Sequence, residues 1–125
     1  MILHIVDTES WAAARRAGEL RAASLDTVGF VHCSDPGTVH LPANALFRGR
    51  TDLVLLVIDP ARLDVPVRWE PGVPEHPSGV WFPHVYGPIP VSAVAAVYDF
   101  PPEPDGTFRL PAALARGGAA AEPAR

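Results

Sequence analysis

The sequence predicts a single α+β domain with curved, mixed or antiparallel sheets and two or three short helices. Its 125 residues are enough for one hydrophobic core and too few for two. About five or six segments have the alternating or wholly apolar pattern of strands, whereas only two or three have helical character. Helices do not alternate regularly with strands in the second half, which argues against a doubly wound parallel sheet.

The predicted strands are rich in β-branched and aromatic residues and are bounded by turn-forming residues. The run LVLLVI at residues 53–58 is apolar throughout, so we expect both of its faces to be covered. A loop rich in proline and glycine is expected at residues 71–79. The strands are predicted at residues 2–6, 30–33, 53–58, 65–69 and 94–100, with residues 81–90 as a further extended segment.

The first predicted helix begins after Asp7 or Thr8, either of which can cap it, and ends at Gly18. Two short helical turns are expected over residues 36–39 and 43–47, because a proline at position 42 does not suit the interior of one continuous helix. The domain is predicted to span residues 1–110. Residues 111–125, rich in Ala, Gly and Pro, are predicted to form a flexible C-terminal tail.

The charge pattern narrows the range of partners. The chain has 14 acidic and 10 basic residues, and every basic residue is an arginine. These arginines are scattered and form no basic run, so duplex DNA is not expected as a partner, although a nucleotide can still enter a local pocket. The absence of lysine excludes a Schiff-base lysine. No protein partner is indicated by the sequence.

Cysteine usage and hydropathy bear on the cellular compartment. The single cysteine, Cys33, excludes an internal disulfide and an all-cysteine metal site, so the chain does not need an oxidising compartment. The chain opens without a basic-then-apolar leader, and its longest apolar run is far shorter than a membrane span. We therefore expect a cytoplasmic protein that does not enter the membrane.

Three histidines, His4, His32 and His84, lie in predicted β segments whose other residues are mostly apolar. Burying an imidazole costs free energy unless the ring is hydrogen-bonded or lines a wet cleft. In the stretch GFVHCS, His32 and Ser34 point to the same side of a strand, while Cys33 points to the other side and is expected to pack in the core. A single strand histidine is more often structural, but three together predict a shared polar cleft.

The segment WFPHVYGPIP has the same mixed character. If it is extended, His84 and Tyr86 share one face, where Tyr86 or Trp81 can provide a stacking wall for a base; the alternative is an aromatic clamp within the core. Glu70 ends a strand and is either a solvated acid or the one carboxylate that reaches the cleft. The candidate catalytic residues are thus His4, His32, His84 and Glu70, and the candidate binding residues are Ser34, Tyr86 and Trp81.

A metal site is the weaker interpretation of these histidines. They come with neither an H-x-H nor an HExxH spacing, and no carboxylate ligand is evident beside them. We therefore predict no metal ligands and keep a mononuclear metal hydrolase only as an alternative.

Several segments together resemble a known family. The motifs ILHIV, GFVHCS, FRG, DLVLLVID and FPHVYGPIP, spread over residues 2–100, are similar to those of the small bacterial family known as domain-of-unknown-function family 952. The family name carries no activity. Its fold is understood to be similar to that of the ADP-ribosyltransferases and the RNA 2'-phosphotransferases. Those enzymes hold NAD or an ADP-ribosylated intermediate in a cleft between two small sheets.

The resemblance implies roles for individual residues. In that superfamily a histidine or arginine on the first strand binds a ribose hydroxyl, and His4 occupies this place. A second motif ends in an aromatic residue or histidine and a serine, which His32 and Ser34 match. A third motif usually gives a glutamate, where this chain has His84 and Tyr86 instead, so Glu70 can substitute only if its loop folds inward.

Two main hypotheses follow. The first is an ADP-ribosyltransferase-like domain that takes NAD or a related nucleotide as its substrate in a histidine-lined cleft and transfers or hydrolyses ADP-ribose. The second is a non-catalytic module that binds a nucleotide or a protein after losing the catalytic acid. The glutamate missing from the third motif favours the second, and turnover of a nucleotide panel separates the two.

Overall fold

The computed structural model describes residues 1–115 and 122–123 and contains two main antiparallel sheets. The larger sheet has the order β1 (Ile2–Asp7), β4 (Leu53–Ile58), β8 (Val94–Asp99) and β9 (Glu122–Pro123). Every strand pair in it is antiparallel. All six residues of β4 are buried, because this central strand is covered on both faces, as its apolar sequence predicts.

The second main sheet has three strands in the order β3 (Val31–His32), β6 (Trp81–Val85) and β5 (Val67–Pro71), again antiparallel. A small pair joins β2 (Glu19–Leu20) to β7 (Ile89–Pro90). The two main sheets meet where Leu3 of β1 pairs with Ser34, just after β3. The prediction of an α+β fold with antiparallel sheets and short helices is confirmed at this level.

The helices of the described residues are short, and the first is the longest of them. In α1 (Thr8–Ala17) the Asp7 carboxylate accepts a hydrogen bond from the Ser10 backbone N–H, and Gly18 ends the helix with a φ of 87°, a left-handed conformation that suits glycine. Both ends agree with the sequence prediction. The remaining helices are α2 (Ser24–Thr27), α3 (His40–Leu46), α4 (Ala112–Ala115) and the 3₁₀ turns η1 (Pro60–Arg62) and η2 (Val91–Ala93).

The segment around Pro42 differs from the prediction. We expected a break at Pro42, but α3 is continuous and Pro42 is its third residue. A proline in the first turn removes no hydrogen bond that the helix needs, which explains why it is tolerated there. Elsewhere the differences are small: β3 is two residues long and β5 begins at Val67 rather than at residue 65.

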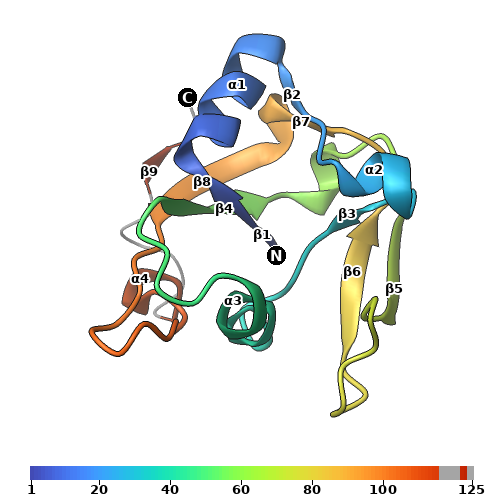
Figure 1. The fold of residues 1–125 in the computed structure, drawn as a ribbon. Helices are drawn as coiled ribbons and strands as arrows, with labels where there is room; N and C mark the ends of the chain where they lie inside the picture. The colour runs from blue at the N-terminus through green and yellow to red at the C-terminus, as the bar shows by residue number, and fades with distance from the viewer. Residues whose placement is uncertain (116–121, 124–125) are drawn as a thin grey trace.

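Two hydrophobic clusters cover the two faces of the larger sheet. On one face Leu56 and Ile58 pack with Trp11 of α1 and with Val31 and Val85 of the three-stranded sheet. On the other face the cluster contains residues of β1, β4, α3 and the C-terminal region: Leu3, Leu55, Val39, Ala43, Phe100, Phe108 and Leu114. Accordingly, α1 and α3 lie on opposite sides of this sheet (Figure 1).

The C-terminal region takes part in these contacts. Leu114 of α4 is buried in the second cluster, and residues 122–123 pair with β8. The rest of the tail predicted over 111–125, namely residues 116–121 and 124–125, lies outside the described residues. In the described part of the chain, no helix is both long and apolar enough to cross a membrane.

Shortening a side chain in the central strand should lower the free energy of unfolding far more than shortening a side chain on the surface. Leu56 is fully buried in β4, whereas Leu46 at the end of α3 is 73% exposed. We expect Leu56→Ala to lower the free energy of unfolding by about 2–5 kcal/mol, because it leaves a cavity in the core. The matched change Leu46→Ala should stay within about 0.5 kcal/mol of the wild type. Urea denaturation measures both, and equal effects would contradict this account of the core.

Candidate functional site

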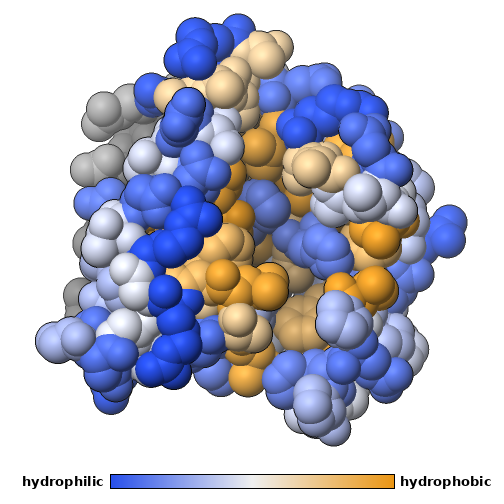
Figure 2. All heavy atoms as spheres, in the orientation of Figure 1, coloured by the Kyte–Doolittle hydropathy of each residue, from blue (hydrophilic) through white to orange (hydrophobic). Residues whose placement is uncertain are grey.

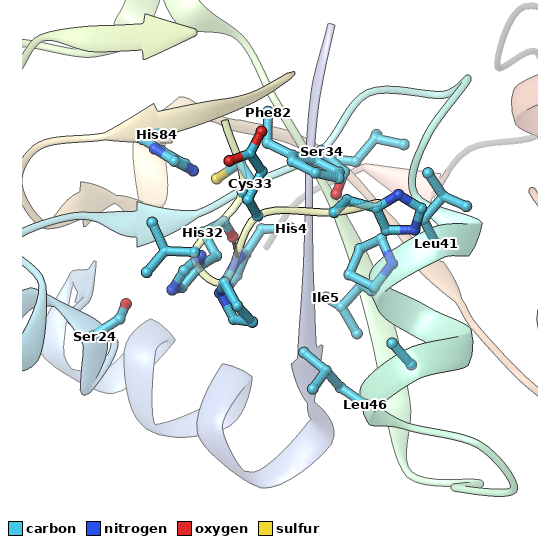
Figure 3. A pocket seen from close by; sticks show the side chains of 18 of the residues that line it. His4, Ile5, Ser24, His32, Cys33, Ser34, Leu41, Leu46, Phe82 and His84 are labelled. Atoms are coloured by element: carbon cyan, nitrogen blue, oxygen red, sulfur yellow. Dashed lines mark hydrogen bonds between the residues drawn. The ribbon is translucent and has the colours of Figure 1, made fainter. Parts of the chain in front are cut away.

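A cavity of about 530 Å³, called here the main cavity, opens between the two main sheets and α3. Figure 2 shows this face of the molecule hollowed at its centre, with hydrophobic side chains around the hollow. One wall is apolar and consists of α3 and the residue after it: Leu41, Pro42, Ala45, Leu46 and Phe47. The opposite side carries His4, His32, Ser34 and His84 (Figure 3). The volume is in the range of small-molecule sites.

The three-stranded sheet has one polar and one apolar face, and this explains the composition of GFVHCS. His32 pairs directly with His84, and His84 pairs with Arg68, so these three residues form a row on one face. Val31 and Val85 pair on the opposite face and belong to the core. Cys33 is also buried in that core, as predicted, and burial raises the pKa of its thiol well above its usual range.

A hydrogen-bonded group of three side chains lies on the polar face. His84 Nδ1 donates to Glu70 Oε1 at 2.9 Å, and the Tyr86 hydroxyl donates to the same oxygen at 2.5 Å. The His84 side chain is 1% exposed, whereas that of Glu70 remains 34% exposed. The Phe30 ring stacks on the His84 imidazole, with centroids 3.8 Å apart and planes at 18°. His84 is therefore held in one orientation by an acid and an aromatic ring.

The hydrogen bonds in this group shift the pKa values of Glu70 and Tyr86 in opposite directions. The Tyr86 hydroxyl and then the His84 imidazole lower the pKa of Glu70, because hydrogen bonds favour the ionised carboxylate. The same bond raises the pKa of Tyr86, since losing its proton would place two anions side by side. The Arg68 guanidinium carbon lies 5.1 Å from the centroid of the Tyr86 ring. Glu70 is thus an ionised acid at neutral pH.

His4 reaches the main cavity from the other sheet. Its Nδ1 lies 2.7 Å from the carbonyl oxygen of His32, so that nitrogen carries the proton and donates. Loss of water around the ring lowers the pKa of His4, and this effect exceeds the opposing effect of the hydrogen bond. The pKa of His32 is also lowered, first by desolvation and then by the neighbouring His84. These rings therefore favour the neutral form at neutral pH.

Most of the candidate site residues come together. His4, His32, Ser34 and His84 line the main cavity. Glu70 and Tyr86 line a second cavity of about 290 Å³, called here the side recess, which shares His84, Gly72 and Val73 with the main cavity. Glu70 sits on strand β5 rather than on a loop, and its carboxylate turns toward the polar face.

Trp81 is the exception among the candidates. It is 56% exposed and lines neither the main cavity nor the side recess. Trp81 pairs with Pro71 at the end of the sheet, and the alternation of β6 turns it away from the face that carries Phe82 and His84. Among the described residues, no three histidine, cysteine or acidic side chains are grouped so as to hold a metal ion.

Two further residues belong to the site and were not predicted. Phe30 stacks on His84 and also contacts the rings of His32 and Tyr86. The alternation that aligns His32 with Ser34 extends back to Phe30, so the sequence carried this signal. His76 lines the main cavity from the loop after β5, and its Nδ1 accepts from the Ser78 backbone N–H at 3.1 Å. No periodicity marks His76 in that loop.

Comparison of the sequence with protein families shows to which family the chain belongs. Residues 5–97 match the family described as Protein of unknown function (DUF952). The chain belongs to this family. Its match includes GFVHCS, Glu70 and FPHVYGPIP, so every candidate except His4 lies within the shared region.

The chain is also similar in fold and sequence to solved structures. The crystal structure of protein CC0527 from Caulobacter crescentus is 32% identical, with a TM-score of 0.79, and the match covers 91% of this chain and 97% of that one. The solution NMR structure of CC0527 is also 32% identical, with a TM-score of 0.73 and coverage of 92% and 97%. The comparison with curated proteins gives no significant match. DUF952 membership and this fold are thus shown, and neither carries an activity.

The lowered pKa of His4 predicts how stability depends on pH. A histidine with a lower pKa in the folded state binds fewer protons there than in the unfolded chain, so stability falls as the pH drops through the ordinary value of about 6.5. We expect the melting temperature to fall between about pH 7.5 and 5.5, and to fall less in His4→Asn, whose amide can still donate to the His32 carbonyl.

Thermal melts over this pH range test the prediction, with the exposed His40→Asn as the matched control. The control should follow the wild type. If His4→Asn shows the same pH dependence as the wild type, His4 does not carry the effect.

Proposed function

We propose that this chain is an ADP-ribosyltransferase-like protein of the cytoplasm that binds NAD or a related nucleotide across the main cavity and the adjoining side recess and transfers or hydrolyses its ADP-ribose. The similarity of GFVHCS and its neighbours to motifs of that superfamily motivates the proposal. The position of Glu70 supports it most directly, because the third motif of this chain lacks the usual glutamate.

Glu70 can supply the missing carboxylate. It lies on β5 but joins His84 and Tyr86 of the third motif through two hydrogen bonds to one oxygen, Oε1. Its other oxygen takes part in neither bond, and the side chain keeps 34% of its exposure at the side recess. An ionised carboxylate with one oxygen unengaged, next to a cavity, is suited to stabilise positive charge that develops on a substrate.

The chemistry requires little more than that charge and correct positioning. The bond between the ribose C1' and the nicotinamide ring nitrogen breaks, and its electron pair leaves with neutral nicotinamide. The ribose becomes an oxocarbenium-like cation, which the carboxylate of Glu70 stabilises. Water or an acceptor hydroxyl then attacks C1', and the proton of the attacking O–H passes to the solvent. In this scheme His32 and Ser34 position the ribose, and the nicotinamide ring packs against the apolar wall of α3.

A binding module without turnover is the second candidate. The lining of the two cavities supports it, since none of the described lining residues is an arginine and the chain has no lysine. A pyrophosphate held inside the main cavity would find no guanidinium or ammonium partner there. A nucleotide therefore fits best with its phosphates outside the cavity, and such partial engagement is compatible with sensing alone.

Replacing the acid distinguishes the two candidates. We expect the wild type to release nicotinamide from NAD. Glu70→Gln should lower the rate of release by at least about 10²-fold, because a neutral amide cannot stabilise the cation. Chromatography of the products measures the rate, and isothermal titration with NAD measures binding. Glu9→Gln, which changes an exposed acid of α1 that lines neither cavity, is the control.

Three outcomes are informative. Loss of turnover with retained binding supports catalysis by Glu70. Binding of NAD by the wild type without any turnover supports the binding module. If neither NAD nor ADP-ribose binds at millimolar concentration, the nucleotide proposal is wrong.

A further inference from the structure

A buried ring nitrogen at the main cavity lacks a hydrogen-bond partner. His84 Nε2 is buried and makes no hydrogen bond with any described residue. The other ring nitrogen, Nδ1, donates to the carboxylate of Glu70. When the imidazole is neutral, Nδ1 carries the proton and Nε2 carries the lone pair, so His84 Nε2 is then a hydrogen-bond acceptor without a donor. An unpaired buried acceptor costs free energy that a bound donor would recover.

His4 presents a second acceptor to the same cavity. Its Nδ1–H is used by the carbonyl oxygen of His32, which leaves the lone pair on Nε2. Both rings line the main cavity, one from β1 and one from β6 (Figure 3). Their orientations are fixed by different partners, a backbone carbonyl and a carboxylate, so the two observations are independent. The rings of His4 and His84, called here the histidine wall, therefore offer acceptors rather than donors.

The charged residues around the two cavities also favour an uncharged hydrogen-bond donor over an anion. Glu75 lines the main cavity and Glu70 lines the side recess, while no arginine lines either within the described chain. Arg68 lies over the Tyr86 ring and is not among the lining residues. An anionic ligand group placed against the histidine wall would meet lone pairs and carboxylates without a cation. An uncharged group that carries N–H donors meets a complementary surface.

We propose that the histidine wall of the main cavity, formed by His4 and His84, binds an uncharged primary carboxamide and rejects the carboxylate of the same shape. The amide NH₂ supplies two donors for this wall, and the body of the ligand packs against the apolar wall of α3. The inference deepens the proposed function and rests on it: in NAD the group with this chemistry is the carboxamide of nicotinamide.

Matched pairs of small ligands test the inference on the full chain. Benzamide and benzoate have the same shape and differ in the donor and the charge, as do nicotinamide and nicotinate. Titrations followed by two-dimensional NMR at about pH 8, where an ordinary imidazole is neutral, give the affinities. We expect each amide to bind at least about tenfold more tightly than its acid, because only the amide satisfies the buried acceptor.

His84→Asn is the informative variant. The asparagine amide can take the place of Nδ1 and keep the bond to Glu70, but it has no counterpart of Nε2. We expect this variant to remain folded and to lose the tenfold preference for the amide, whereas the exposed His40→Asn should keep it. Long-range ¹H–¹⁵N spectra of the imidazoles provide a second measurement, which should show the His84 proton on Nδ1.

Each contrary result overturns the inference in its own way. It fails if acid and amide bind equally well to the wild type, if neither binds at millimolar concentration, or if His84→Asn keeps the preference. It fails as well if the proton of His84 is found on Nε2. An amide preference without any binding of NAD would refute the nucleotide proposal and leave this inference standing. Equal binding of NAD and its carboxylate analogue would refute this inference and leave the nucleotide proposal standing.

Discussion

Two backbone hydrogen bonds between Leu3 and Ser34 join the two main sheets, and the geometry of the site depends on them. Leu3 N–H donates to the Ser34 carbonyl at 2.8 Å, and Ser34 N–H donates to the Leu3 carbonyl at 2.7 Å. Both residues are almost fully buried, so water cannot replace these bonds. The bridge brings His4 of one sheet next to the carbonyl of His32 in the other.

Burial then sets the chemical character of each ring. His84 lies between the Phe30 ring and the rest of the sheet, and Glu70 and Tyr86 complete its surroundings on the polar face. His4 loses most of its contact with water but keeps one donor bond. In its neutral form each of these rings has a defined acceptor side, because its Nδ1–H is already used. The main cavity is thus mostly apolar, with a small number of oriented polar atoms, which is typical of small-molecule sites.

Local signals in the sequence were sufficient for much of the fold and for part of the site. The apolar run at residues 53–58, the Asp7 cap and the Gly18 stop predicted their elements correctly, because each depends on neighbours in the chain. Alternation also placed Cys33 in the core. Pro42 misled the prediction because its effect depends on where the helix begins. The approach of Glu70 to His84 is a long-range pairing, and no local pattern specifies such a register.

Glu70 and the imidazole of His84 that it orients come from the neighbouring strands β5 and β6, so in a related chain the pair depends on how these two strands are aligned. Glu70 faces Phe82 in the β5–β6 ladder, one step along the same face from His84. The register between β5 and β6 must be preserved, whereas the number of residues in the connecting loop can vary. A related chain with a longer or shorter loop would keep the same constellation if its hairpin register were kept. A single inserted residue within β5 would turn the carboxylate to the core face and abolish the constellation while leaving every linear motif intact.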